Sequence, residues 1–125
     1  MKIAICVKDD SGVSARVDDR FGRAEYYLIF DSEYNQSVVI ENSAKNDSAG
    51  AGGKAISLLH KHNVSVIVVP ELGPKALDAV KAFELEAYQI DESKTAQQAV
   101  NSFLAGKLTQ LVTSSVDSHN GLRKA

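Results

Sequence analysis

The sequence is poor in cysteine: among its 125 residues there is one, Cys6, and there is no tryptophan. A single cysteine excludes a disulfide within the chain and also a metal site built from several thiolates of one chain. Long apolar runs are missing too, because the apolar start Ile3–Val7 turns charged at Lys8. Such a run is too short for a signal peptide or a membrane-spanning helix. We therefore expect a cytoplasmic protein without a membrane segment.

An excess of charge of either sign is also absent. The 14 basic and 16 acidic side chains give a net charge of −2, which provides no general field for holding nucleic acid or an anionic membrane. The hydrophobic fraction of 44% and the charged fraction of 24% are typical of globular proteins. We predict one domain at residues 1–108, followed by a polar, flexible C-terminal tail at residues 109–125.

The hydrophobic pattern predicts an α/β domain. Short β-branched or aromatic runs indicate strands, and apolar residues at helical spacing indicate helices. Strands are expected at residues 3–7, 26–30, 38–40, 64–69 and 86–90, and helices at about 50–63, 74–83 and 95–106. Pro74 suits the first turn of a helix, and Thr95 with Gln98 fits a capping box.

This order of elements favours a mixed sheet with helices on both faces. Helical crossovers require parallel neighbours, so four segments should meet at the carboxyl edge of the sheet. They are the loop 8–24, the start of the helix near residue 50, the turn 70–74 and the turn 91–95. Because ligands of open α/β sheets bind at that edge, the topology predicts where a binding site lies.

The glycine-rich stretch Gly50–Lys54, with the sequence GAGGK, begins one of these helices. It lacks the spacing of a Walker A loop. It does read G-x-G-x-x-A, with Glu71 at a suitable distance for a ribose, but a dinucleotide fingerprint follows the first strand directly and this stretch does not. Two interpretations stay open: close helix packing at Gly50, Gly52 and Gly53, or a wall of an anion site at the helix N-terminus.

Several motifs, taken in order, resemble those of a known family. They are RFGRA at 20–24 before an aromatic strand, GAG at 50–52 before a helix, LGP at 72–74 after a buried strand, and FLAGKL at 103–108. Together they are similar to the dinitrogenase iron-molybdenum cofactor biosynthesis family, which contains the NifX-type carriers and the C-terminal domain of NifB. The resemblance covers about residues 1–108.

The resemblance implies a three-layer ribonuclease H-like fold, with a five-stranded mixed sheet in the order 3-2-1-4-5 and an antiparallel second strand. It implies a non-catalytic protein that binds an iron–sulfur or iron–molybdenum cluster precursor and passes it between metallocluster assembly proteins. It places Phe21, Gly22 and Arg23 on the family's Phe-Gly-Arg motif. Arg20 stands where family members commonly have histidine, and arginine cannot ligate iron, although Arg20 and Arg23 can hold an anion by charge-assisted hydrogen bonds.

Other candidate ligands are few. Cys6, near the carboxyl end of the first strand, is a soft ligand that could cap one iron of a preformed cluster, or else a small buried residue. His60 and His62 are two residues apart on a predicted helix, so they cannot share one metal ion. Two other functions fit the same sheet edge: binding of a nucleotide or another small phosphorylated anion, and a protein-interaction adaptor.

Overall fold

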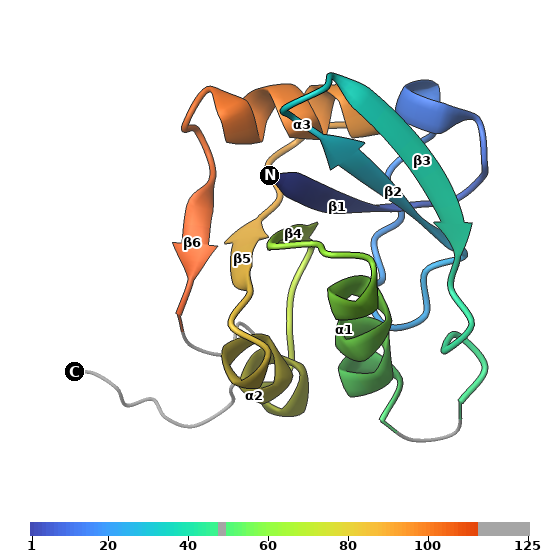
Figure 1. Ribbon diagram of the computed structural model, residues 1–125, viewed down its shortest axis with the longest axis vertical. Helices are drawn as coiled ribbons and strands as arrows, with labels where there is room; N and C mark the ends of the chain where they lie inside the picture. The colour runs from blue at the N-terminus through green and yellow to red at the C-terminus, as the bar shows by residue number, and fades with distance from the viewer. Residues whose placement is uncertain (48–49, 113–125) are drawn as a thin grey trace.

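A mixed β-sheet with helices on both faces forms the centre of the molecule in the computed structural model, which describes residues 1–47 and 50–112 (Figure 1). In these ranges the strands are β1 (Lys2–Val7), β2 (Tyr26–Asp31), β3 (Gln36–Glu41), β4 (Val66–Val69), β5 (Glu86–Gln89) and β6 (Thr109–Leu111). The helices are the 3-10 helix η1 (Gly12–Ser14) and the α-helices α1 (Ala51–Lys61), α2 (Pro74–Ala82) and α3 (Ala96–Leu104).

The strands lie in the order β3-β2-β1-β4-β5-β6. Strand β2 is antiparallel to both β1 and β3, whereas β1, β4 and β5 are parallel. The predicted order of the first five strands and the antiparallel second strand are therefore confirmed.

The predicted number of strands is wrong, because the described ranges contain a sixth. Strand β6 comes from the first residues of the predicted tail and pairs antiparallel with β5, with Leu111 opposite Ala87. Leu111 packs against the core cluster of the sheet. Three residues are too few to give a periodic signal in the sequence, which explains why this strand was not predicted. The rest of the predicted tail, residues 113–125, lies outside the described residues.

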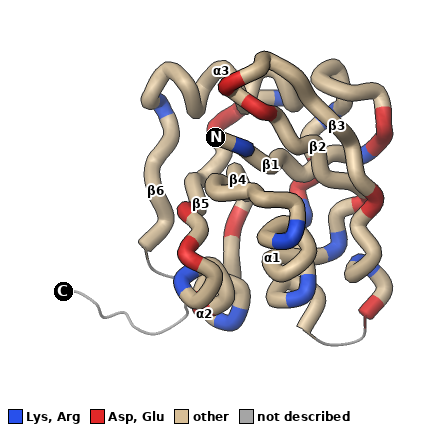
Figure 2. Tube along the Cα trace, viewed as in Figure 1, with Lys and Arg blue, Asp and Glu red and all other residues tan. Residues whose placement is uncertain are grey.

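The alternating side chains of β1 supply two separate core clusters. Ala4 and Cys6 point to the face that α1 and α2 cover, and Ile3 and Ile5 point to the face that α3 covers. All four are buried, as a strand covered on both faces requires. Within the described ranges no helix has the length and hydrophobicity needed to cross a bilayer. Basic and acidic residues are interspersed along the chain trace (Figure 2).

The predicted helix starts agree with the structure. Pro74 lies in the first turn of α2. The Thr95 side chain accepts a hydrogen bond from the Gln98 amide, and the Gln98 side chain in turn bonds to the Thr95 backbone, which completes the capping box of α3. Gly50 caps α1 with a left-handed backbone, φ 74°, a conformation that favours glycine.

The loop between β1 and β2 is anchored to the sheet. Val17 forms an antiparallel bridge with Val7, and the Asp18 amide donates to the Cys6 carbonyl at 2.8 Å. Arg16 forms a second bridge with Thr95 at the start of α3. These bonds hold residues 18–23 at the carboxyl end of β1, which is the edge where the topology predicts a site.

Candidate functional site

A pocket of about 400 Å³ lies at the carboxyl edge of the sheet. Three of the four predicted segments line it: residues 19–23 of the loop, Ala51 and Gly52 at the start of α1, and the turn 70–73 after β4. Ala76 of α2 completes the lining. The fourth segment, the turn 91–95, lines a neighbouring pocket of about 280 Å³ through Asp91, Ser93 and Lys94. The topology therefore brings Arg20, Phe21, Gly22, Arg23 and Gly52 together.

Asp18 fixes the conformation of residues 19–23, which we call the arginine loop. Its carboxylate is fully buried and accepts from the Arg20 amide, from Arg20 Nε and Nη2, each at 3.0 Å, and from the Glu25 amide at 3.4 Å. Burial alone would raise the pKa of Asp18, but the hydrogen bonds and the charge of Arg20 outweigh it, so the pKa lies below its ordinary value. Asp18 is therefore ionised, and its hydrogen bonds fix the position of the Arg20 side chain.

The two arginines are held differently. The Arg20 side chain is 54% exposed although one edge of its guanidinium is bonded to Asp18. Arg23 is exposed, and its Nη1 donates to the Lys45 carbonyl at 2.7 Å. Each guanidinium carries five N–H donors, so both retain donors beyond these bonds. Two exposed carboxylates, Asp19 and Glu71, also line the pocket, which means that an anion would be bound by directed donors rather than by net charge.

Phe21 anchors the loop between the arginines. Its ring is 6% exposed and lies 5.7 Å from the Tyr27 ring, centroid to centroid. The Tyr27 hydroxyl donates to the Phe21 carbonyl. Asn42, which is buried, donates through Nδ2 to the carbonyls of Gly22 and Ala24, each at 2.9 Å. These bonds fix the backbone between Arg20 and Arg23.

The glycines of GAGGK have different roles. A Cβ on Gly52 would lie 3.1 Å from the Ala76 Cβ of α2, so this glycine permits close packing of the two helices and also lines the pocket. Gly50 supplies the left-handed cap, and a Cβ on Gly53 would meet no described atom within 4 Å. The structure brings Gly52 to the pocket and leaves Gly50 and Gly53 out of its lining.

Cys6 lies in the core rather than at the pocket. It is 2% exposed and belongs to the cluster that contains Phe21 and Tyr27. Burial and the nearby charge of Asp18 raise the pKa of its thiol well above the ordinary range. The protonated thiol is thus the stable form, and metals bind the thiolate.

The histidines and acids do not form a metal centre in the described part of the chain. Within residues 1–47 and 50–112, no group of three or more His, Cys, Asp or Glu side chains could hold a metal ion. The His60 ring stacks on Phe83 with 4.8 Å between centroids, whereas His62 lines a different pocket. In the described ranges, the pocket lined by residues 19–23, which we call the arginine pocket, therefore has no such group.

Sequence reasoning missed two buried residues that shape the site, Asp18 and Asn42. No local signal marks them, because Asp18 is followed by Asp19 and Arg20, and Asn42 stands between Glu41 and Ser43. Their burial is explained by the hydrogen-bond partners that the fold supplies. The turn 70–73 was expected at this edge, but Glu71 was considered only as a ribose partner, and Leu72 and Gly73 only as part of a family motif.

Comparison with known proteins agrees with this architecture. The family described as dinitrogenase iron-molybdenum cofactor matches residues 1–106. An uncharacterized protein of Methanocaldococcus jannaschii is 31% identical over 111 residues, covering 86% of this chain and 89% of that protein.

Two solved structures are similar over most of their length. The apo form of the orange protein from Desulfovibrio gigas superposes with a TM-score of 0.86 at 30% identity, covering 91% of this chain and 95% of that one. A NifB-type protein of the DUF35 family from Thermotoga superposes with a TM-score of 0.79 at 32% identity, covering 93% of this chain and 97% of that one.

Proposed function

The chain belongs to the dinitrogenase iron-molybdenum cofactor family, and we propose that it is a non-catalytic carrier of a preformed, anionic metal–sulfur cluster. The family is associated with cofactor binding or biosynthesis rather than with catalysis. The cluster, an iron–sulfur or iron–molybdenum cofactor precursor, would be cargo that cytoplasmic assembly proteins deliver and receive. The observation that carries the proposal is the pocket that joins Arg20–Arg23 to Gly52 and the turn 70–73.

The chemistry of the lining supports binding of a cluster that brings its own ligands. Arg20 and Arg23 present N–H donors, and charge-assisted hydrogen bonds to an anion are about twice as strong as neutral ones. Arg20 stands where related proteins commonly have histidine, so this chain would hold its cargo by hydrogen bonds instead of by ligation. Cargo held in this way can be released without breaking a protein–metal bond.

Uptake of a cluster tests the proposal. The full chain would be titrated anaerobically with a preformed, thiolate-ligated iron–sulfur cluster, and binding followed by visible absorbance. We expect saturable uptake that Arg23→Gln weakens and Glu71→Gln strengthens, because the first change removes the charged guanidinium and the second removes a repelling carboxylate. Arg16→Gln is the matched control, since Arg16 lines the neighbouring pocket. No uptake by the unmodified chain would refute the carrier function.

A second candidate function uses the same donors. The pocket at the carboxyl edge also suits a small phosphorylated anion or a nucleotide. Thermal-shift measurements with inorganic phosphate and with ATP would then show stabilisation that Arg23→Gln reduces. A flat response to cluster, phosphate and nucleotide alike would favour a protein-interaction adaptor.

A further inference from the structure

Strand β3 is an edge of the described sheet and lacks the usual protection of edges. It pairs with β2 over its whole length, from Gln36 opposite Asp31 to Glu41 opposite Tyr26, without a bulge. Its sequence, QSVVIE, contains no proline, lysine or arginine. Natural proteins usually shorten an edge strand, bulge it or place lysine or proline on it, because unpaired backbone groups recruit another strand. The other edge, β6, is shortened to three residues, whereas β3 is not.

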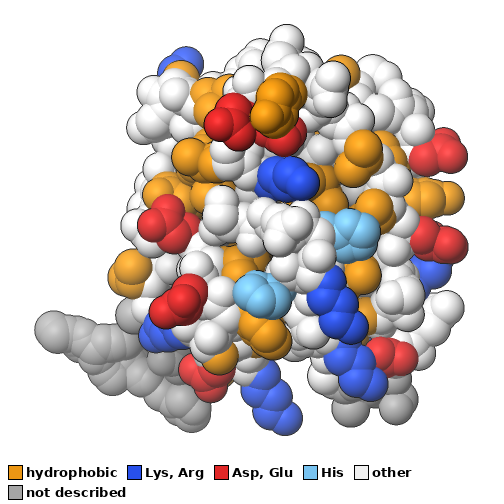
Figure 3. All heavy atoms as spheres, viewed as in Figure 1, with side chains coloured by type: hydrophobic (Ala, Val, Ile, Leu, Met, Phe, Trp, Pro, Cys, Tyr) orange, Lys and Arg blue, Asp and Glu red, His pale blue; other side chains and the backbone are white. Residues whose placement is uncertain are grey.

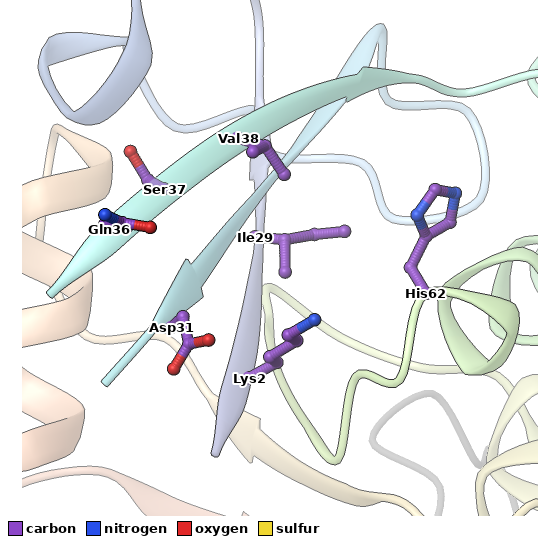
Figure 4. Close-up of a pocket in the computed structure, with 7 residues that line it drawn as sticks. All are labelled: Lys2, Ile29, Asp31, Gln36, Ser37, Val38 and His62. Carbon is purple, nitrogen blue, oxygen red and sulfur yellow. The ribbon is translucent and has the colours of Figure 1, made fainter. Parts of the chain in front are cut away.

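A groove borders this edge at the amino end of β1 (Figure 4). It has a volume of about 400 Å³ and is lined by Lys2, Ile29, Asp31, Gln36, Ser37, Val38 and His62. Its floor is the cross-strand pair Ile29 and Val38. Helix α1 ends at Lys61, and His62 just beyond it stands at the rim across from Ile29. The space-filling view shows histidine and apolar side chains close together on this face (Figure 3).

Val38 is the unusual residue of the groove. It is 58% exposed, while its partner Ile29 is 4% exposed. Val39 and η1 pack on the opposite face of the sheet, where Val13 contributes to the second core cluster. In the part of the chain that the structure describes, the outer edge of β3 and the Val38 side chain are thus both exposed to solvent beside the groove.

We propose that β3 pairs antiparallel with β3 of a second copy, so that two sheets join into one. Only a strand satisfies a row of backbone donors and acceptors, and a two-fold axis is the commonest symmetry of protein dimers. The charges of the strand do not oppose this pairing. Glu41 is its only charged residue, and antiparallel pairing sends the two Glu41 side chains to opposite ends.

The same pairing covers Val38. Residues directly opposite in an antiparallel pair share a face of the sheet, so Val38 packs on Val38 or Ile40 of the second copy, depending on register. The strand of the second copy also closes the groove on its open side. The arginine pocket lies at the carboxyl end of β1 and the groove at its amino end, so pairing leaves the pocket accessible. The inference is independent of what that pocket binds.

Sedimentation equilibrium of the full chain tests this interface. From about 10 µM to about 1 mM, the mass should rise with concentration from 13.4 kDa toward that of a dimer. Val38→Lys places a charge on the edge and should keep the chain monomeric throughout. The matched control is Gln110→Lys on the exposed opposite edge β6, which should dimerise like the unmodified chain. Circular dichroism of both variants checks that the fold is intact.

Amide hydrogen exchange identifies the surface that is used. Protection of β3 amides should increase with concentration in the unmodified chain and not in Val38→Lys. A chain that stays at 13.4 kDa throughout overturns the proposal. So does a dimer that survives Val38→Lys, or one in which exchange from β3 does not change. If β3 pairs with a different protein and not with itself, the chain alone would also stay at 13.4 kDa, and the proposal would be wrong.

Discussion

Gly22 lies against the backbone of Gly52, so close that a Cβ on Gly22 would stand 2.8 Å from the Gly52 nitrogen. The contact joins the arginine loop to the first turn of α1. Gly52 in turn allows Ala76 of α2 to approach. Gly22 of the arginine loop and Gly52 of the GAGGK stretch are far apart in the sequence, but they pack against each other and together form one wall of the pocket.

Gly22→Ala should destabilise the fold. Because the added methyl would meet backbone atoms, which cannot rotate away, we expect a loss of about 1–3 kcal/mol in the free energy of unfolding. Gly53→Ala is the control, since a Cβ there meets no described atom within 4 Å, and it should stabilise α1 by up to about 1 kcal/mol. Urea unfolding measures both. Equal midpoints for Gly22→Ala and the unmodified chain would contradict the close contact.

Asp18 should make stability depend on pH. Its pKa in the folded state lies below the ordinary value of 3.8, so its contribution is complete above that value and is lost as the pH falls through the folded pKa. Asp18→Asn should lower stability near neutral pH by about 1–3 kcal/mol and flatten the loss of stability in acid. Asp9 and Asp91 also have lowered pKa values. The loss of stability at acid pH should therefore be smaller in Asp18→Asn than in the unmodified chain, but it should not disappear. Urea unfolding across acid pH measures the slope, and an unchanged slope would refute this role.

Asn42 should be needed for the loop conformation. Asn42→Ala removes the donor to the carbonyls of Gly22 and Ala24 and the acceptor of the Ala44 amide. Leaving buried backbone groups unpaired costs about 1–3 kcal/mol each, so thermal unfolding should begin at a clearly lower temperature. Asn46→Ala, at an exposed position, should shift the melting temperature by no more than about 2–3 °C. Similar melting temperatures for the two variants would count against this role.

The Cys6 thiol should be unreactive in the native state. It is buried and its pKa is raised, whereas alkylation requires an exposed thiolate. Iodoacetamide should label it at least about 100-fold more slowly than in denaturant, where local opening no longer limits the rate. Mass spectrometry over time gives the two rates. Fast native labelling would show that the thiol is accessible and would restore Cys6 as a candidate cluster ligand.

Much of the fold could be predicted because its signals are local. The β-branched run before Pro70, the proline at position 74 and the Thr95–Gln98 capping box each specify an element within a few residues. Strand β6 could not be predicted, because its three residues acquire their conformation from pairing with β5. Tertiary pairing, rather than propensity, determines such short strands.

The site was less predictable, because it depends on contacts between distant segments. Topology was enough to bring Arg20–Arg23 and Gly52 to one edge. It did not show that Asp18 would engage one side of Arg20, or that Asn42 would hold the Gly22 carbonyl. Residue type alone also could not decide whether Cys6 is a cluster ligand or a buried core residue. Its position on β1 turns its side chain toward the core.

Nuclear magnetic resonance mapping of cluster binding tests the central claim most directly. The ¹⁵N-labelled full chain would be titrated anaerobically with the thiolate-ligated iron–sulfur cluster, and backbone amide signals followed. We predict that amide signals of residues 19–23, 51–52 and 71–73 broaden first, because these line the arginine pocket, while those of Val38 and His62 at the far groove stay sharp. Broadening centred elsewhere, or none at all, would contradict the account.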